Sequence, residues 1–269
     1  STQIRATQSP TTISSPTAET ASPDAKPELF GCPMPDLSHT LEQNIADVRH
    51  AIHDAERAAG RAEGSVELLP VTKFHPVERI VELAQHGFNL VGENREQEAR
   101  DKASHLAGRC GIAMIGQIQT KKANAVARWA AEVHSLDSVK LANGLERGMG
   151  LALERGDRTT EILPCMVQLS YDGDAARGGA TPENVPAVVD VVEGARHLEL
   201  AGFMVVPPLD SEPREVFAQA RALTDAYATQ LGRGLRLSAG MSGDFREAIA
   251  CGSDIVRVGT ALLGTRPVR

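Results

Sequence analysis

The feature that most constrains the fold of this chain is a regular alternation of short apolar segments with longer amphipathic ones, from about residue 66 to residue 258. The short segments have the composition of β-strands, and the longer ones repeat their apolar residues at helical spacing. Strands that alternate with helices pair in parallel through right-handed crossovers. Because the chain offers eight such strands, we predict an α/β fold that closes into a single (β/α)8 TIM barrel.

The strands are predicted at residues 66–73, 89–93, 111–115, 132–136, 162–169, 198–205, 235–239 and 254–258. The helices are predicted at 76–86, 95–107, 121–131, 139–154, 184–195, 213–231 and 244–250. An extra N-terminal helix is expected at 38–59, where apolar residues recur at helical spacing and Gly60 follows. An open doubly wound sheet is the alternative, but no G-x-G-x-x-G sequence follows the first strand, as it would in a dinucleotide fold.

Residues 1–35 consist largely of Ser, Thr, Pro and Ala and show neither strand nor helix periodicity. Such a segment cannot bury enough apolar surface to offset the entropy lost on ordering, so we predict a disordered tail. Residues 36–269 are predicted to form one barrel domain. Single barrels commonly reach about 250 residues, so a chain of 269 residues needs no second folded domain.

The composition argues against several kinds of partner. A net charge of −7 disfavours binding to nucleic acid or to anionic membranes, which attract clustered Lys and Arg. The chain has no apolar run long enough to span a membrane and no signal peptide, so we expect it in the cytoplasm. The four cysteines form no CxxC pair, and the histidines form no HxH or HExxH pattern. We therefore expect reduced thiols and no metal site.

Lys73 lies at the end of the first predicted strand. Strand alternation puts Leu69, Val71 and Lys73 on one face, which would line the barrel interior. Apolar surroundings lower the pKa of a lysine, and the neutral amine is the form that attacks an aldehyde. The alternative is a lysine that extends into solvent from the strand end.

Two turns near the C-terminus have the composition of an anion site. The seventh strand is followed by the sequence SAGMSGD, and the eighth by Gly259 and Thr260. Glycines let the backbone approach a ligand closely, while the Ser242 hydroxyl and free N–H groups donate to an anion. Barrel enzymes often bind phosphate with these two loops, although ordinary turns share this composition. A lysine beside a phosphate site would hold a phosphorylated aldehyde, of which pyridoxal 5'-phosphate (PLP) is the commonest.

Three further residues could contact the ring of such a ligand. Arg257 shares a strand face with Gly259 and would reach over the site, where a permanently protonated guanidinium disfavours a protonated ring nitrogen. Its alternative role is a salt bridge to a neighbouring strand. Asn94 could hydrogen-bond a ring hydroxyl or cap the following helix. Met204 could pack on the ring or belong to the core.

These residues fall in motifs that resemble one known family. From about residue 41 to residue 264, the chain is similar to the pyridoxal phosphate homeostasis proteins, single-barrel relatives of the cofactor-binding domain of bacterial alanine racemases. The matching runs are VTKFHP, VGENREQEA, IGQIQTKK, HSLDS, RGG, GFMVVPP, SAGMSGD and RVGTALLG. The chain departs from the family pattern at Ala113, Met114 and Lys121, so contacts of the third strand transfer less directly than the others.

The resemblance implies how the cofactor is bound. PLP would form a Schiff base with Lys73, and its pyridine nitrogen would face Arg257. Its phosphate would be bound by Ser242, Gly259 and Thr260. The remaining candidates for the cofactor site are Val71, Asn94, Met204 and Met241. No residue is assigned a catalytic role.

The resemblance also implies a function without catalysis. Members of the family are thought to carry or buffer PLP, a form of vitamin B6, and to keep amino-acid and keto-acid pools balanced. The expected partners are PLP itself and apo forms of PLP-dependent enzymes, and we expect a monomer.

Two enzymatic functions remain as alternatives. A PLP-dependent amino-acid racemase of this barrel type needs a tyrosine from an additional domain. This chain has only Tyr171 and Tyr227, and it ends soon after the eighth strand. A Schiff-base lyase without a cofactor needs a general acid and base beside the lysine. Barrel aldolases usually place that lysine on a later strand.

Overall fold

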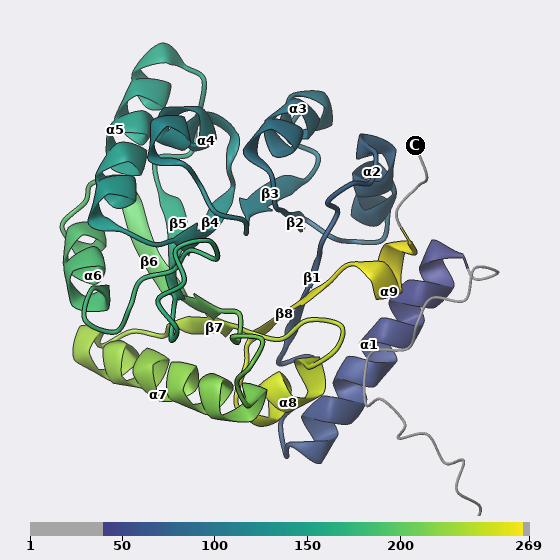
Figure 1. Ribbon diagram of the computed structural model, residues 1–269. Coiled ribbons are helices and arrows are strands. Elements are labelled where there is room, and N and C mark those ends of the chain that lie inside the picture. Colours follow the sequence, from purple (N-terminus) through teal and green to yellow (C-terminus); the bar gives the residue numbers. More distant parts are fainter. Residues whose placement is uncertain (1–39, 266–269) are drawn as a thin grey trace, which may run out of the picture.

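The computed structural model describes residues 40–265. Eight parallel strands form a barrel with helices around its outside (Figure 1). The predicted disordered tail, residues 1–35, lies outside the described residues, and so does the end of the chain from residue 266.

Strands and helices alternate along the chain, as predicted. The strands are β1 (Glu67–Pro70), β2 (Leu90–Glu93), β3 (Gly111–Met114), β4 (Glu132–Leu136), β5 (Leu163–Leu169), β6 (Leu198–Val205), β7 (Arg236–Ser238) and β8 (Ile255–Val258). The helices are α1 (Leu41–Ala58), α2 (Val77–Gln85), α3 (Glu96–Leu106), α4 (Ala123–Trp129), α5 (Val139–Arg155), α6 (Val185–Glu193), α7 (Pro213–Leu231), α8 (Phe245–Ala250) and α9 (Thr260–Leu263), with a 3-10 turn, η1 (Thr120–Lys122), before α4.

The order of the strands in the sheet is β1-β8-β7-β6-β5-β4-β3-β2. The two ends of this sheet meet, because Val71 forms a parallel bridge with Gly92, and the Thr72 N–H donates to the Gly92 carbonyl at 3.0 Å. Strands that are consecutive in the chain are therefore neighbours all the way round. The barrel prediction is confirmed, and the open doubly wound sheet is wrong.

Three local predictions need correction. The first strand was expected to reach Lys73, but β1 ends at Pro70, and Lys73 lies in the turn that follows. The helix expected at 121–131 begins with the 3-10 turn η1. Helix α9 was not predicted, because four residues are too few to show a helical period.

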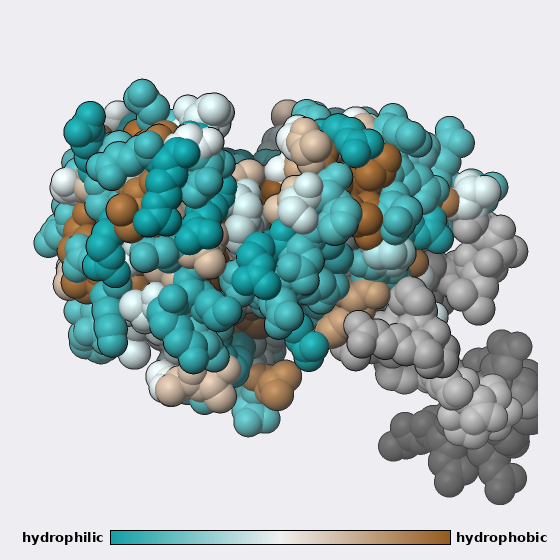
Figure 2. Space-filling model, turned by 90° about the horizontal axis from the view of Figure 1, so that it is seen from above, coloured by the Kyte–Doolittle hydropathy of each residue, from teal (hydrophilic) through white to brown (hydrophobic). Residues whose placement is uncertain are grey.

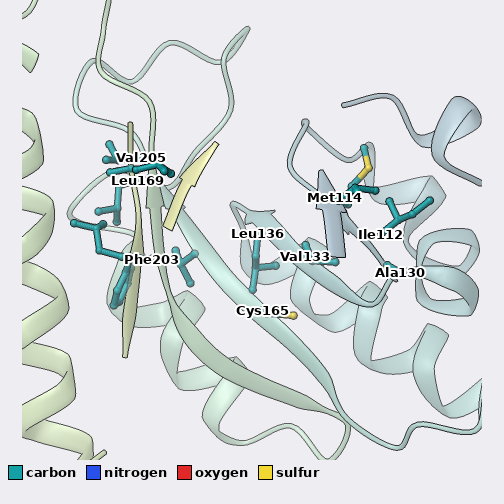
Figure 3. Close-up of a cluster of buried hydrophobic side chains, with 14 of the residues drawn as sticks. Ile112, Met114, Ala130, Val133, Leu136, Cys165, Leu169, Phe203 and Val205 are labelled. Atoms are coloured by element: carbon teal, nitrogen blue, oxygen red, sulfur yellow. The ribbon is translucent and has the colours of Figure 1, made fainter. Parts of the chain in front are cut away.

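The core consists of two layers, which follow from the alternation of side chains along each strand. The outer layer joins strands to helices, and Figure 3 shows its part around β3, β4, β5 and β6. The inner layer fills the barrel with Leu69, Met166, Met204 and Ile255, all of which come from strands. The barrel is thus packed with side chains in its middle.

Helix α1 lies beside α8 and α9 on the outside of the barrel (Figure 1). Thr40 begins it with a capping box, in which the side chains and backbones of Thr40 and Gln43 bond reciprocally. The Asn44 amide donates to the Leu262 carbonyl at 3.1 Å. The extra helix therefore supports the turn that follows β8.

The face of the molecule in Figure 2 is mostly polar. Within residues 40–265, no helix is both long and apolar enough to cross a bilayer. Among the described residues, Cys110 and Cys165 are buried free thiols and Cys251 is a partly exposed one. Cys32 is outside the described residues.

Candidate functional site

The candidate residues come together where the strands end. Val71 donates its N–H to the Val258 carbonyl at 2.8 Å, which puts the end of β1 beside the turn after β8. Arg257 donates its N–H to the Gly240 carbonyl at 2.9 Å, which joins that turn to the one after β7. Met204 pairs with Ser238 across β6 and β7. In parallel barrels this end of the strands is where functional sites form.

Lys73 is exposed at this end of the barrel. Leu69 faces the packed interior and Val71 is buried beside β8, as the strand pattern predicts. The prediction fails at Lys73, because the chain has left the strand and turned before it reaches this residue. The amine therefore stands at the barrel rim and not among apolar side chains.

Arg257 is 3% exposed and reaches into the interior, as predicted. One guanidinium nitrogen donates to the Ser238 hydroxyl at 2.8 Å, and another to the Val205 carbonyl at 3.1 Å. Among residues 40–265 it forms no ion pair, so its alternative role as a salt bridge is wrong. Burial lowers the pKa of Arg257 to about 10, and the charge of Asp244 opposes this shift.

Gly240 and Gly259, in the turns after β7 and β8, have little room for a side chain. A Cβ on Gly240, where φ is +94°, would lie 2.6 Å from the Cβ of Ala248, and a Cβ on Gly259 would lie 3.2 Å from the Val71 carbonyl oxygen. No group in the described part of the chain accepts from the backbone N–H of Ser242 or Gly243. Donors on a tightly turned backbone suit an anion, so the residues present fit a phosphate.

Three further candidates differ in exposure. Asn94 is exposed and does not cap α3, because Arg95 is the N-cap residue and no side chain caps that helix. A Cβ on Gly116, at the end of β3, would lie 1.9 Å from the Asn94 carbonyl oxygen, so this backbone contact requires glycine. Met204 is 1% exposed and belongs to the interior cluster. Met241 is 41% exposed.

The opposite end of the barrel holds a charged cluster. Arg236 on β7 contacts Glu67 on β1 at 2.9 Å and Glu132 on β4 at 3.5 Å. His134 Nε2 lies 2.7 Å from Glu132 Oε2. Since β4 and β7 are not neighbours in the sheet, the side chains of Glu132 and Arg236 meet across the barrel interior. Burial raises the pKa of Glu132, but the hydrogen bond and charge of His134 and the charge of Arg236 outweigh it and hold this pKa below its ordinary value.

Both tyrosines pack against apolar side chains of the outer layer. The ring of Tyr227 packs on Phe203 in the outer layer, with 5.3 Å between centroids. Tyr171 lines a small pocket with Ala180 and Leu223, between α6 and α7.

Sequence reasoning missed several residues around the site. Ser238 binds Arg257 from the next strand, and Arg177 attaches the loop after β5 to the carbonyls of Val206 and Pro207 at 2.9 and 2.7 Å. A cluster around Lys102 lies behind the turn that carries Lys73. Sequence signals were present without a role being assigned: Arg177 and Ser238 stand in the runs RGG and SAGMSGD, and Glu98 and Lys102 are four residues apart on a predicted helix.

The chain matches the family model "Alanine racemase, N-terminal domain" over residues 45–267. It is 55% identical to the pyridoxal phosphate homeostasis protein of Corynebacterium glutamicum over 208 residues, covering 77% of this chain and 94% of the relative. It is 40% identical to the protein of the same name from Mycobacterium bovis, over 87% of this chain and 96% of that one.

Solved structures agree with the barrel. PipY of Synechococcus elongatus, solved with PLP bound, is 29% identical to this chain and has a TM-score of 0.69. The match covers 84% of this chain and 100% of PipY. The alanine racemase of Corynebacterium glutamicum is 20% identical with a TM-score of 0.58, over 85% of this chain and 62% of the racemase. At that identity the second likeness concerns the fold alone.

Proposed function

The chain belongs to the pyridoxal phosphate homeostasis family, and we propose that it is a non-catalytic PLP-binding protein that carries or buffers the cofactor. One observation carries the proposal. Lys73 and the glycine-bearing turns after β7 and β8 converge at one end of the barrel, in a chain whose relatives bear the name of PLP homeostasis proteins.

In this proposal Lys73 holds the cofactor covalently. Its amine condenses with the aldehyde, forming one C=N bond and releasing one water molecule. Ser242, Gly259 and Thr260 bind the phosphate through hydroxyl and backbone N–H donors. The contacts to the ring are assigned to Val71, Asn94, Met204 and Met241.

Arg257 is proposed to face the pyridine nitrogen. When bound, PLP supplies an electrophilic aldehyde and an electron-withdrawing ring. A guanidinium can only donate a hydrogen bond, so Arg257 favours an unprotonated ring nitrogen and weakens that electron withdrawal. The arrangement suits storage of PLP better than carbanion chemistry.

Reduction with borohydride tests the anchor. We expect the purified protein to bind PLP with a yellow colour, and peptide mass spectrometry after reduction to find the pyridoxyl group on Lys73. Lys73→Ala should abolish the adduct, whereas Lys140→Ala, which removes an exposed lysine on α5, should keep it. An adduct that persists on another residue of the Lys73→Ala protein would contradict the assignment.

Proton exchange tests the absence of catalysis. The PLP-loaded protein is incubated with single L-amino acids in heavy water, and the α-proton is followed by NMR. We expect no exchange or racemisation at ordinary enzymatic rates, which begin at about 1 per second. Turnover at such a rate would favour the racemase alternative.

The partners and the cellular location are proposals as well. We propose that the chain is a cytoplasmic monomer that delivers PLP to apo forms of PLP-dependent enzymes. The free thiols of Cys110, Cys165 and Cys251 are consistent with a reducing compartment. Light scattering on the purified protein tests whether it is a monomer. Delivery is tested by loading an apo-enzyme with PLP, which should be faster from this protein than from free PLP at equal concentration.

A further inference from the structure

A buried ionic cluster lies directly behind Lys73. Lys102 on α3 is 7% exposed, and its ammonium group donates to the Thr72 carbonyl at 2.9 Å, to Glu93 Oε1 at 2.6 Å and to Glu98 Oε1 at 2.8 Å. All three ammonium protons thus have acceptors. The cluster joins the turn after β1, the end of β2 and the middle of α3.

The cluster holds the backbone on both sides of Lys73. Before it, the Thr72 carbonyl accepts from Lys102, and the Thr72 hydroxyl donates to Glu93 Oε1 at 2.5 Å. After it, the Phe74 N–H donates to Glu98 Oε1 at 2.7 Å. The residue that should carry the cofactor is therefore flanked by two fixed neighbours.

Phe74 shows that this turn is held under strain. Its φ is +68°, a left-handed conformation that bulky side chains rarely adopt. Such residues persist where surrounding contacts determine the conformation, and they are concentrated at functional sites. Here the Glu98 carboxylate holds the N–H of Phe74, and the Arg95 guanidinium lies 5.2 Å from the centre of its ring.

Glu93 indicates that the cluster is not optimised for stability. Burial raises the pKa of Glu93, while the hydrogen bond and charge of Lys102 lower it. Its second oxygen, Oε2, is buried without a partner. Buried ion pairs of this kind contribute little net stability compared with apolar packing, and fixing a geometry is one reason to retain them.

We propose that Lys102 is a positioning residue for Lys73. With Glu93 and Glu98 it fixes the backbone on both sides of Lys73, and so fixes the place at the barrel rim from which the amine reaches the aldehyde. This inference rests on the proposed function, because it concerns the rate at which PLP condenses with Lys73. Misplacement of a reacting group by about 1 Å can reduce a rate about a hundredfold.

The test measures the rate of PLP loading by stopped-flow absorbance of the imine. The melting temperature of each variant reports its stability, and borohydride reduction with peptide mapping reports which lysine carries the adduct. Lys102→Met should load at least about tenfold more slowly than wild type while still carrying the reduced adduct on Lys73. Lys122→Met is the matched control. Lys122, in η1, contacts Glu96 at 3.5 Å, and Glu96 lies on α3 as Lys102 does, but Lys122 does not touch the turn. It should load at the wild-type rate.

A second pair of variants covers the case in which Lys102→Met does not fold. Glu98 is one-quarter exposed, so its replacement is tolerated more easily. Glu98→Ala removes the acceptor of the Phe74 N–H and should slow loading, whereas Glu98→Gln keeps an oxygen there and should restore most of the rate. Leu145→Ala, which shortens a fully buried side chain of α5, lowers the melting temperature without touching the turn and should leave loading unchanged.

The outcomes separate this inference from the proposed function. If Lys102→Met, or in its place Glu98→Ala, folds and loads at the wild-type rate, the cluster is only structural and the inference is wrong. If loading slows equally in Leu145→Ala, general destabilisation is the cause and the inference is again wrong. If wild type itself gives no reducible adduct on Lys73, the proposed function fails instead.

Discussion

At the scale of single residues, burial determines the chemistry of the ionisable side chains. Arg257 remains inside the barrel, where its acceptors within residues 40–265 are two neutral oxygens, and burial lowers its pKa to about 10. A buried cation without a carboxylate partner opposes folding. Stability therefore does not explain why Arg257 is buried. Its place beside the proposed cofactor site supports the role proposed for it, which is to face the pyridine nitrogen.

Cys110 provides a prediction at this scale. Burial raises its pKa to about 11, so at pH 8 only about one molecule in a thousand carries the reactive thiolate. In the folded protein, iodoacetamide should therefore modify the partly exposed Cys251 well before Cys110, with both reacting in denaturant. A time course followed by peptide mass spectrometry measures the two rates, and equal labelling of the folded protein would show that Cys110 is accessible.

At the scale of elements, the contact between α4 and α5 depends on two glycines. A Cβ on Gly144 would lie 2.9 Å from the Cβ of Ala123, and a Cβ on Gly148 would lie 2.9 Å from the Cβ of Ala127. Real Cβ atoms do not approach that closely, so the two helices need small residues on both sides. Gly150, on the same helix, has no atom within 4 Å of such a position.

These glycines predict opposite effects of one substitution. Gly148→Ala should lower the free energy of unfolding by about 1 kcal/mol or more, because overpacking exceeds the gain in helix propensity. Gly150→Ala should raise it by about 0.5–1 kcal/mol, because alanine loses less conformational entropy in a helix. Urea unfolding of the two variants measures the difference. Stabilisation by both would mean that the helices separate without cost.

At the scale of the whole molecule, the barrel has two polar ends around an apolar middle. Arg236, Glu132 and His134 meet across the interior at one end, while Arg257 and the cofactor candidates lie at the other. Leu69, Met166, Met204 and Ile255 separate them. Glu132 therefore links stability at low pH to one end of the barrel, and the proposed cofactor site lies at the other.

Glu132 predicts a loss of stability in acid. Its pKa is lower in the folded protein than the ordinary value of 4.5, so its stabilising contribution is complete above that value. The contribution is lost as the pH falls through the folded pKa. Glu132→Gln should therefore be less stable than wild type at about pH 7, and this difference should shrink towards about pH 3.

Urea unfolding at a series of pH values measures this difference. The comparison isolates Glu132. Burial raises the pKa of Glu93, so Glu93 changes the stability with pH in the opposite direction, but it does so equally in both proteins and cancels in the difference. Glu154→Gln, which alters an exposed carboxylate on α5, is the control. A constant difference between wild type and Glu132→Gln at all pH values would refute the assignment.

Much of the fold could be predicted because its signals are local. All eight strands lie inside their predicted ranges, since each apolar segment and each helical period is present within a short stretch of sequence. The candidate residues Lys73, Asn94 and Ser242 were found because they follow strand ends, and a parallel barrel brings all strand ends of one kind together. Arg257 was found because it shares a face of the last strand with Gly259.

The sequence by itself determined the alternation of elements and hence which residues share the functional end. Only the tertiary structure decided that the chain turns before Lys73, that Lys102 supports this turn, and that Arg236 meets Glu132 across the interior. The physical reason is that hydrophobic periodicity is encoded by neighbours in the chain. Contacts between side chains from distant strands depend on how far the closed sheet brings those strands together, and no local pattern contains that distance.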